Sequence, residues 1–202
     1  MKIICIGRNY KEHIKELKNK YSSEITFFLK PQTAIPVKNQ PFFLPDFTQE
    51  IHHEIEIIIK INRTGKFIQK KFSNRYYNEI SLGIDFTARD IQDNLKKMGL
   101  PWEKAKAFDG SAPIGKFINK DDFDLENIDF MLKVNGEIKQ NGNSKNMINN
   151  IDEIISYISK YITLKKGDII FTGTPKGVGK IYKNDVLEGF IDGKKLLHVD
   201  VV

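Results

Sequence analysis

The chain has 202 residues, 40% of them apolar and 29% charged, which is typical of one soluble globular domain, and we expect a single domain over residues 1–202. Its formal net charge of +6 comes from lysines that are interleaved with acids, so the charge does not indicate a nucleic-acid-binding protein. With one cysteine, no signal-peptide pattern and no run of about 18 apolar residues, we expect a cytoplasmic protein without disulfides or membrane spans.

The first 45 residues predict a strand, a helix, a second strand and an extended segment. Residues 1–7, "MKIICIG", form an apolar strand that ends at a glycine. A helix is expected over about residues 9–20, with Asn9 as its N-cap and with apolar side chains at helical spacing, namely Tyr10, Ile14 and Leu17. Residues 24–30 predict a strand that Pro31 stops, and the prolines that follow keep the chain extended.

The middle of the chain predicts two strands and a helix. Residues 52–61, "HHEIEIIIKI", form an isoleucine-rich strand that contains two acids. Residues 81–86, "SLGIDF", predict a short strand, and residues 87–99 predict a helix that Gly99 ends.

The last 75 residues predict two hairpins, a helix and a strand. Asn135-Gly136 and Asp192-Gly193 are the turn dipeptides of the two hairpins, since both favour a type I′ turn. Between the hairpins lie a helix over residues 151–162 and a strand over residues 167–173. Strands outnumber helices and do not alternate regularly with them, which favours an α+β fold with antiparallel or mixed sheet over a Rossmann or TIM layout.

Glu54 and Glu56 stand at alternate positions of the isoleucine-rich strand. In a strand they project to the same face, about 6.6 Å apart along the backbone, while Ile55 and Ile57 take the opposite face. On an exposed face they would be solvated charges. Because the strand becomes apolar on both faces from Ile57 onward, we place the acids at the mouth of a buried region, where two like charges raise each other's pKa unless a cation lies between them.

Asp85 is a third acid, at the end of the next predicted strand. Three carboxylates without a cysteine partner suit Mg²⁺ or Mn²⁺ better than a structural zinc. His52 and His53 lack the spacing of a zinc-protease helix, and their role stays open. A regular strand directs His53 to the face opposite the two acids, whereas a bulge could bring it round.

The glycine-rich segment "GTPKGVGK" is not a P-loop. Five residues separate Gly173 from Gly179 where the motif needs four, and Ile181 stands where it needs serine or threonine. A turn that offers amide donors and Thr174 to a small carboxylate is the remaining interpretation.

Seven blocks of the sequence, in consistent order over nearly the whole chain, resemble the fumarylacetoacetate hydrolase family. The blocks are "GRNYKEHIKE", "FFLKPQTAI", "HHEIEI", "GIDFTARDIQ", "GLPWEKAKAFDGSAPIG", "VNGEIKQNGN" and "GDIIFTGTPKGVG". They are most similar to short members of the acylpyruvate hydrolase and oxaloacetate decarboxylase type. The resemblance implies a mixed β-sheet roll or sandwich with a few peripheral helices, Mg²⁺ or Mn²⁺ as the cofactor, a small 2-oxoacid as the substrate, and a homodimer.

The resemblance also implies roles for individual residues. The divalent metal would be held by Glu54, Glu56 and Asp85. The catalytic residues would be Lys106 and, on a lid helix over about residues 9–20, His13 and Glu16. The substrate would be bound by Arg8, Arg89, Gln92 and Thr174.

The predicted catalytic residues also have simpler interpretations. From spacing alone, His13 and Glu16 are a surface ion pair worth well under about 1 kcal/mol. Beside a metal site, Glu16 could instead fix the imidazole tautomer so that His13 takes a proton from water, and the helix could close as a lid. Lys106 lies in the basic stretch with Lys104, but three nearby acids would balance its charge and let it polarise a substrate oxygen or move a proton.

These residues suit cleavage or proton transfer next to a ketone. We expect hydrolysis of a C–C bond in an acylpyruvate, with pyruvate enolate as the leaving group, or decarboxylation of oxaloacetate, which needs no water. An isomerase or tautomerase of enolic 2-oxoacids is the alternative enzyme. A metal-binding scaffold or a nucleic-acid partner with a degenerate site is the alternative without catalysis.

Overall fold

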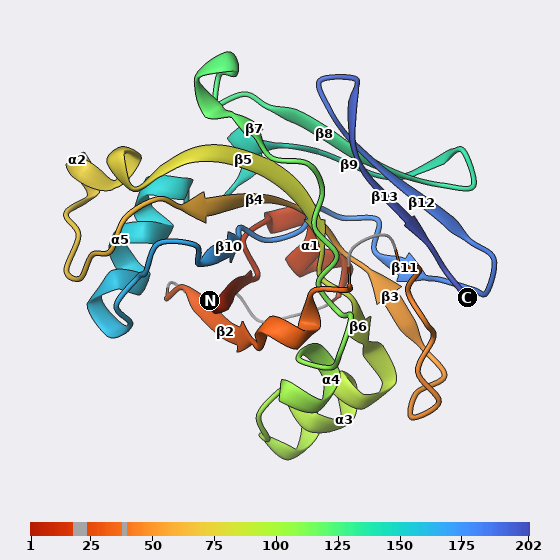
Figure 1. Ribbon diagram of the computed structural model, residues 1–202. Helices are drawn as coiled ribbons and strands as arrows, with labels where there is room; N and C mark the ends of the chain where they lie inside the picture. Colours follow the sequence, from red (N-terminus) through yellow and green to blue (C-terminus); the bar gives the residue numbers. More distant parts are fainter. Residues whose placement is uncertain (18–23, 38–39) are drawn as a thin grey trace.

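The protein is built from three β-sheets with short helices at their ends (Figure 1), and the computed structural model describes residues 1–17, 24–37 and 40–202. The largest sheet has six strands in the order β2-β1-β10-β4-β5-β7. Its strands are β1 (Ile3–Gly7), β2 (Thr26–Lys30), β4 (Ile55–Ile61), β5 (Tyr77–Ile84), β7 (Ile118–Asn119) and β10 (Ile169–Phe171). β1 and β10 are parallel and the other neighbours antiparallel, so the expected α+β fold with mixed sheet is confirmed.

A four-stranded antiparallel sheet in the order β13-β12-β8-β9 packs against the six-stranded sheet. Its strands are β8 (Asp129–Val134), β9 (Glu137–Asn143), β12 (Val186–Ile191) and β13 (Lys194–Asp200). The two predicted hairpin turns are confirmed, because φ is positive at both central residues of each turn. The φ values are 52° at Asn135, 83° at Gly136, 44° at Asp192 and 77° at Gly193.

The main hydrophobic core includes the facing sides of these two sheets. From the six-stranded sheet it contains Ile55, Ile57 and Ile59, and from the four-stranded sheet Leu132 and Leu187, all with no exposed surface. Each such side chain stabilises the fold by about 1.5–3 kcal/mol relative to an exposed one. The sandwich therefore provides a rigid frame for whatever lies at its edge.

The short helices lie at the ends of the sheets. They are α1 (Lys11–Glu16), α2 (Lys70–Ser73), α3 (Arg89–Met98), α4 (Glu103–Lys106) and α5 (Ile151–Tyr161), with 3₁₀ turns at η1 (Gln32–Ala34), η2 (Asn74–Tyr76), η3 (Lys120–Asp122) and η4 (Ser144–Asn146). α5 begins at a capping box between Asn150 and Glu153, and α3 ends at Gly99 with φ of 64°, as predicted. In the described part of the chain, no helix has the length and apolar character needed to cross a membrane.

Three predicted elements differ from the structure. The strand expected over residues 52–61 is interrupted at Glu54, between β3 (Ile51–His53) and β4. The helix expected from residue 87 begins at Arg89, because residues 87–88 form β6 (Thr87–Ala88), which pairs with β3. β3 also pairs with β11 (Gly179–Lys180), which completes the third sheet. The helix expected over residues 9–20 is only six residues long, and positions 18–20 lie outside the described residues.

Asn9 was predicted to be the N-cap of α1, and this prediction is wrong. Tyr10 takes that position, without a side-chain cap bond. Instead, the buried Asn9 amide joins two distant segments. Its Nδ2 donates to the carbonyl oxygens of Asn149 and Thr172, at 2.9 and 2.8 Å, and its Oδ1 accepts from the backbone N–H of Asn149 at 2.8 Å. Gly173 allows this approach, since a Cβ there would lie 2.7 Å from the Cβ of Asn9.

We expect Asn9→Ala to lower the free energy of unfolding by about 2–4 kcal/mol, because it leaves buried donors and acceptors without partners. Urea denaturation measures the change. Asn62→Ala is the control, since its bond to Asn78 is exposed and its loss should cost less than about 0.5 kcal/mol. Equal small losses in both variants would contradict the anchoring role.

Candidate active site

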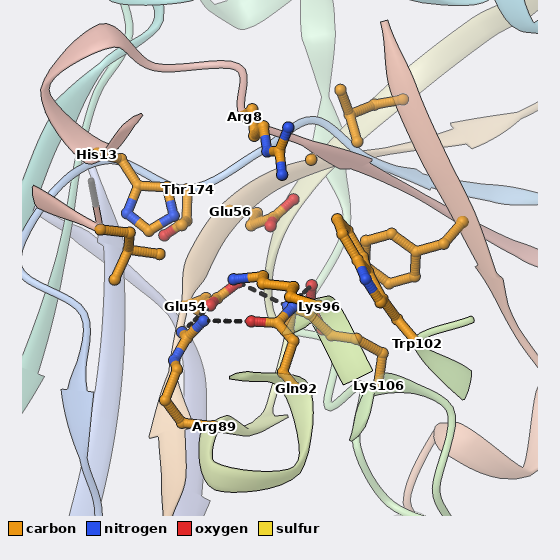
Figure 2. Close-up of a pocket in the computed structure, with 15 residues that line it drawn as sticks. Arg8, His13, Glu54, Glu56, Arg89, Gln92, Lys96, Trp102, Lys106 and Thr174 are labelled. Carbon is orange, nitrogen blue, oxygen red and sulfur yellow. Dashed lines mark hydrogen bonds and ion pairs between the residues drawn. The ribbon is translucent and has the colours of Figure 1, made fainter. Parts of the chain in front are cut away.

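One cavity collects almost all the residues singled out in the sequence (Figure 2). Its lining includes Arg8, His13, Glu54, Glu56, Asp85, Arg89, Gln92, Lys106 and Thr174. Glu16 does not line it but is hydrogen-bonded to His13, which does. Residues from positions 8 to 174 therefore meet at one place.

The three acids meet because of how the chain crosses from β3 to β4. The interruption at Glu54 separates the two strands by one residue, and the Glu54 carbonyl accepts a 2.8 Å hydrogen bond from the backbone N–H of Asp85. Ile55 is paired with Ile84, so Asp85 stands beside Glu54 at the end of the antiparallel ladder. Glu56 lies two residues further along β4.

Glu54, Glu56 and Asp85 are buried, and one ligand oxygen from each lies within 4.8 Å of the others. Burial, and next the negative charge of Asp85, raise the pKa of Glu56 well above its usual value. Gly173 opposes this rise, because its N–H donates to Glu56 Oε2 at 2.6 Å. Glu56 therefore holds a proton in the metal-free protein at a pH where an exposed glutamate is ionised.

Glu54 is held as the charged form. Burial alone would raise its pKa, but Lys106 and then Arg89 lower it well below the usual value. The Arg89 guanidinium donates to Glu54 Oε1 and, at 2.6 Å, to Gln92 Oε1. His52 lies beneath Arg89, with its Nδ1 3.5 Å from the guanidinium Nε and its Nε2 3.2 Å from Glu50.

Lys106 Nζ uses all three of its donors inside the site. It donates to Glu54 Oε2 at 2.8 Å, to Asp85 Oδ2 at 2.7 Å and to Thr87 Oγ1 at 2.6 Å. Burial lowers the pKa of Lys106, but the charges of Asp85 and Glu54 outweigh burial and raise it overall. Lys106 is therefore a fixed ammonium that holds two of the acids in place.

Lys30, at the end of β2, is a second buried lysine that the sequence analysis missed. Its Nζ lies 2.7 Å from Asp85 Oδ1, on the side away from Lys106, and donates to the carbonyl of Ser111 at 2.8 Å. The side chain has no exposed surface. The sequence feature that could have indicated its burial is the position of this lysine in the apolar run "TFFLK", just before a proline.

These residues fit a divalent cation. All three candidate ligands are carboxylates, the donor type that Mg²⁺ and Mn²⁺ prefer, and no thiol lies among them. Lys106, Lys30 and Arg89 balance Glu54 and Asp85, whereas the hydrogen-bond donor that Glu56 finds among the described residues is the backbone N–H of Gly173, and its pKa is raised. A cation among the three acids would allow Glu56 to ionise.

His13 and Glu16 form a hydrogen-bonded pair on α1. Glu16 Oε2 lies 3.1 Å from His13 Nδ1, and Glu16 Oε1 accepts from the Gly177 N–H at 2.9 Å. Burial alone would raise the pKa of Glu16, but the hydrogen bonds from His13 and Gly177 lower it. An ionised Glu16 places the imidazole proton on Nδ1 of His13 and leaves Nε2 as the ring nitrogen that can accept another. The same carboxylate ties α1 to the glycine-rich loop.

The Gln140 side chain fixes the orientation of His53 and Thr174. Its Oε1 accepts from the Ile55 N–H at 2.9 Å and its Nε2 donates to the Pro175 carbonyl at 3.0 Å, so the amide cannot be reversed. His53 Nδ1, 2.9 Å from Oε1, must therefore carry a proton. Thr174 Oγ1 must accept from Nε2 at 2.8 Å and donate to the Ile55 carbonyl at 2.8 Å.

Two expectations are resolved by this network. His53 points away from the acids, as expected for a strand without a bulge, and does not line the cavity. Burial lowers its pKa, so it is a neutral donor that supports Gln140. The Thr174 hydroxyl proton is already used on a backbone carbonyl, which leaves its backbone N–H and a lone pair for a substrate.

Lys96 and Trp102 also line the cavity and were missed in the sequence. Lys96 follows Arg89 and Gln92 on α3 at spacing i, i+3, i+7 and so lies on the same helical face. This spacing could have identified Lys96 as a cavity residue from the sequence. Trp102 is the only tryptophan of the chain. Its ring centre lies 5.9 Å from both Lys96 Nζ and Arg8 Cζ.

The chain was compared with known protein families and solved structures. The family model of the fumarylacetoacetate (FAA) hydrolase C-terminal domain matches residues 2–201. The chain is 44% identical over 192 residues to the mitochondrial oxaloacetate tautomerase FAHD1 of Rattus norvegicus, covering 95% of this chain and 87% of that protein. It is 40% identical over 197 residues to the oxaloacetate tautomerase YcgM of Escherichia coli, covering 96% and 90%.

A solved structure of high similarity contains a metal ion and a ligand. It is the crystal structure of the fumarylpyruvate hydrolase of Pseudomonas aeruginosa in complex with Mn²⁺ and pyruvate. The TM-score is 0.93 at 35% sequence identity, covering 100% of this chain and 89% of that one.

We expect Mg²⁺ and Mn²⁺ to bind more tightly as the pH rises. The proton held by Glu56 must leave before that carboxylate can take a dication, so about one proton should be released per ion bound. Calorimetry in buffers of different ionisation enthalpy measures both quantities. Glu56→Gln should lose the released proton and weaken binding by at least about 100-fold, whereas the exposed Glu103→Gln should match the wild type.

The stability of the metal-free protein should depend on pH in the direction opposite to metal binding. A carboxyl group whose pKa is raised by folding favours the folded state at low pH, so the metal-free protein should lose stability as the pH rises from about 4.3 through the raised pKa of Glu56. Proton release that persists in Glu56→Gln would contradict the assignment to this residue.

Proposed function

We propose that this chain, which belongs to the fumarylacetoacetate hydrolase family, converts a small 2-oxoacid through its enolate, and that keto–enol tautomerisation of oxaloacetate is the reaction supported best. Family membership makes it an enzyme, which sets aside the scaffold and nucleic-acid alternatives. The observation that carries the proposal is a proton acceptor, His13, in the same cavity as three buried carboxylates. The similarity to the oxaloacetate tautomerases of Rattus norvegicus and Escherichia coli supports the choice of substrate.

A divalent cation held by Glu54, Glu56 and Asp85 would act as a Lewis acid toward the carboxylate and 2-oxo oxygens of the substrate and so acidify its C3 protons. Mg²⁺ and Mn²⁺ both suit these ligands, and the similar fumarylpyruvate hydrolase was solved with Mn²⁺. Lys106 and Lys30 keep Glu54 and Asp85 oriented whether or not the cation is bound.

His13 moves the proton in this proposal. With Nδ1–H donated to Glu16, Nε2 takes a proton from C3 of oxaloacetate and the imidazole becomes an imidazolium beside a carboxylate. The electron pair of the C–H bond forms the C2–C3 double bond, and the 2-oxo oxygen gains the negative charge. The imidazolium then returns the proton to that oxygen, which gives the enol and restores His13.

Hydrolysis of an acylpyruvate is the second candidate, favoured by the same pair on α1. His13 Nε2 would take a proton from water, the hydroxide would attack the distal carbonyl, and the C–C bond would break to give a carboxylic acid and the enolate of pyruvate. Decarboxylation of oxaloacetate gives the same enolate with loss of carbon dioxide and needs no base.

The other residues would bind and orient the substrate. Arg89 and Gln92 are bonded to each other and Arg89 to Glu54, so they set the position of a metal ligand and present the remaining guanidinium surface to the cavity. The Thr174 backbone N–H, at the start of the glycine-rich loop, is suited to a carboxylate. Arg8 stands at the edge of the cavity in Figure 2.

The test is a substrate screen in which the enol of oxaloacetate is followed by ultraviolet absorbance and pyruvate by a coupled enzyme assay. With Mg²⁺ or Mn²⁺ we expect rapid tautomer conversion and slower pyruvate release, while acetylpyruvate and fumarylpyruvate test the hydrolase. Chelator should abolish the activity. A Glu56→Gln protein that keeps full activity in chelator would overturn the proposal.

His13→Ala separates the reactions. We expect tautomerisation and acylpyruvate hydrolysis to fall about 10²- to 10⁴-fold, because both need a base, and decarboxylation to fall much less. Added imidazole should restore part of the lost rate. Lys15→Met, on the exposed side of the same helix, is the matched control and should behave as the wild type. Equal loss of all three reactions without imidazole rescue would show that His13 is not the base.

A further inference from the structure

The charges around the cavity are not balanced by the proposed metal site. Four cationic side chains and three carboxylates line it, so a bound dication brings the total formal charge of these groups to +3. Arg89 and Lys106 are bonded to the acids. Arg8 and Lys96 are the cations left over: among the described residues neither forms an ion pair with the three acids, and both lie beside Trp102.

Lys96 lies on the cavity side of α3 with only 23% of its side chain exposed. Within the described part of the chain, its one ion pair is a 3.8 Å contact with the exposed Asp93, which is too long to be a strong hydrogen bond. Burial and the charge of Arg89 lower the pKa of Lys96. An ammonium in such a place is disfavoured until an anion joins it.

Arg8 is half-buried and, among the residues that the structure describes, has no hydrogen-bonding or ion-pair partner. Its backbone is in the left-handed region with φ of 61°, which is unfavourable for a side chain of this size. The next residue, Asn9, is held by its buried hydrogen bonds, so the conformation of Arg8 is imposed by the fold. Figure 2 shows the guanidinium directed into the cavity.

Trp102 positions both cations. Arg8 Cζ and Lys96 Nζ each lie 5.9 Å from its ring centre, so they are at most twice that distance apart. Phe28 packs against the indole edge-to-face at 5.9 Å and keeps it in place. The result is a preformed pair of positive groups beside Trp102, in the wall of the same cavity that the three acids line.

We propose that Arg8 and Lys96 bind a second carboxylate of the substrate, so that the enzyme is selective for dicarboxylic 2-oxoacids. The inference rests on the proposed function, in which the first carboxylate and the 2-oxo oxygen lie at the metal site formed by the three acids. A monocarboxylate would leave Lys96 and Arg8 without a counter-charge, whereas a dianion offers each of them an acceptor. Lys96 and Arg8 are then specificity-determining residues.

The same contact bears on which reaction follows. Loss of carbon dioxide from oxaloacetate requires the C4 carboxylate to give up its negative charge to the carbon chain. Ion pairs with Arg8 and Lys96 stabilise the charged carboxylate and so oppose that step, while they leave proton removal at C3 unaffected. The pair therefore favours tautomerisation over decarboxylation.

The experiment compares oxaloacetate with its 4-ethyl ester, which keeps the first carboxylate and the ketone but lacks the second charge. In Lys96→Met and Arg8→Met we expect kcat/KM for oxaloacetate to fall about 10- to 100-fold, with a loss for the ester at least tenfold smaller. The ratio of pyruvate release to tautomerisation should rise in both variants. Lys97→Met, on the exposed side of α3, is the control and should match the wild type on both substrates.

Titration of Mn²⁺ by calorimetry shows whether each variant is folded and keeps its metal site, and Lys96→Gln replaces any variant that fails this test. Equal losses on oxaloacetate and the ester would overturn the inference. If the wild type converts neither compound, the proposed function fails, and the inference is then decided by binding. Tighter binding of oxaloacetate than of the ester in the wild type but not in Lys96→Met supports it, and equal binding overturns it.

Discussion

Three carboxylates share one buried space, and the repulsion among them is the constraint on which the rest of the site depends. A buried charge without a partner costs several kcal/mol. The structure offsets this cost with cations from three elements that are distant in sequence, namely Lys30 on β2, Arg89 on α3 and Lys106 on α4. These ion pairs fix the elements around the acids. Among the residues that the structure describes, Glu56 is the one acid of the three without an ion pair to a cation, and that asymmetry makes the site suitable for a metal ion.

Behind the acids lies a polar network centred on Gln140. One amide, that of Gln140, bonds two backbone groups and two side chains from two distant segments, residues 53–55 and residues 174–175. Since its orientation admits no alternative, the proton positions on His53 and Thr174 follow from it. A network of this kind stabilises the interruption at Glu54, because the Glu54 carbonyl, the Ile55 N–H and the Ile55 carbonyl all have hydrogen-bond partners there.

Much of the fold and the grouping of Glu54, Glu56 and Asp85 could be predicted because the signals are local. Alternate spacing placed Glu54 and Glu56 on one face, and the Asn-Gly and Asp-Gly turns marked both hairpins. The features that could not be predicted depend on contacts between distant segments. The interruption at Glu54 leaves the period-2 pattern unchanged, and helix α3 begins late because the two residues before it pair with β3. The sequence does not distinguish a buried lysine such as Lys30 from an exposed one. Its burial is explained by the ion pair with Asp85, which comes from a distant segment.

Trp102 gives the cavity an optical reporter. It is the only tryptophan in the chain, so the indole fluorescence of the protein comes from a single ring in the cavity wall. The emission of indole shifts with the electric field around it, and two cations stand 5.9 Å from its centre. An anion that enters and draws those charges toward itself changes the field at the ring. Occupation of the site can therefore be followed in real time by stopped-flow spectroscopy on the unlabelled, unmutated protein.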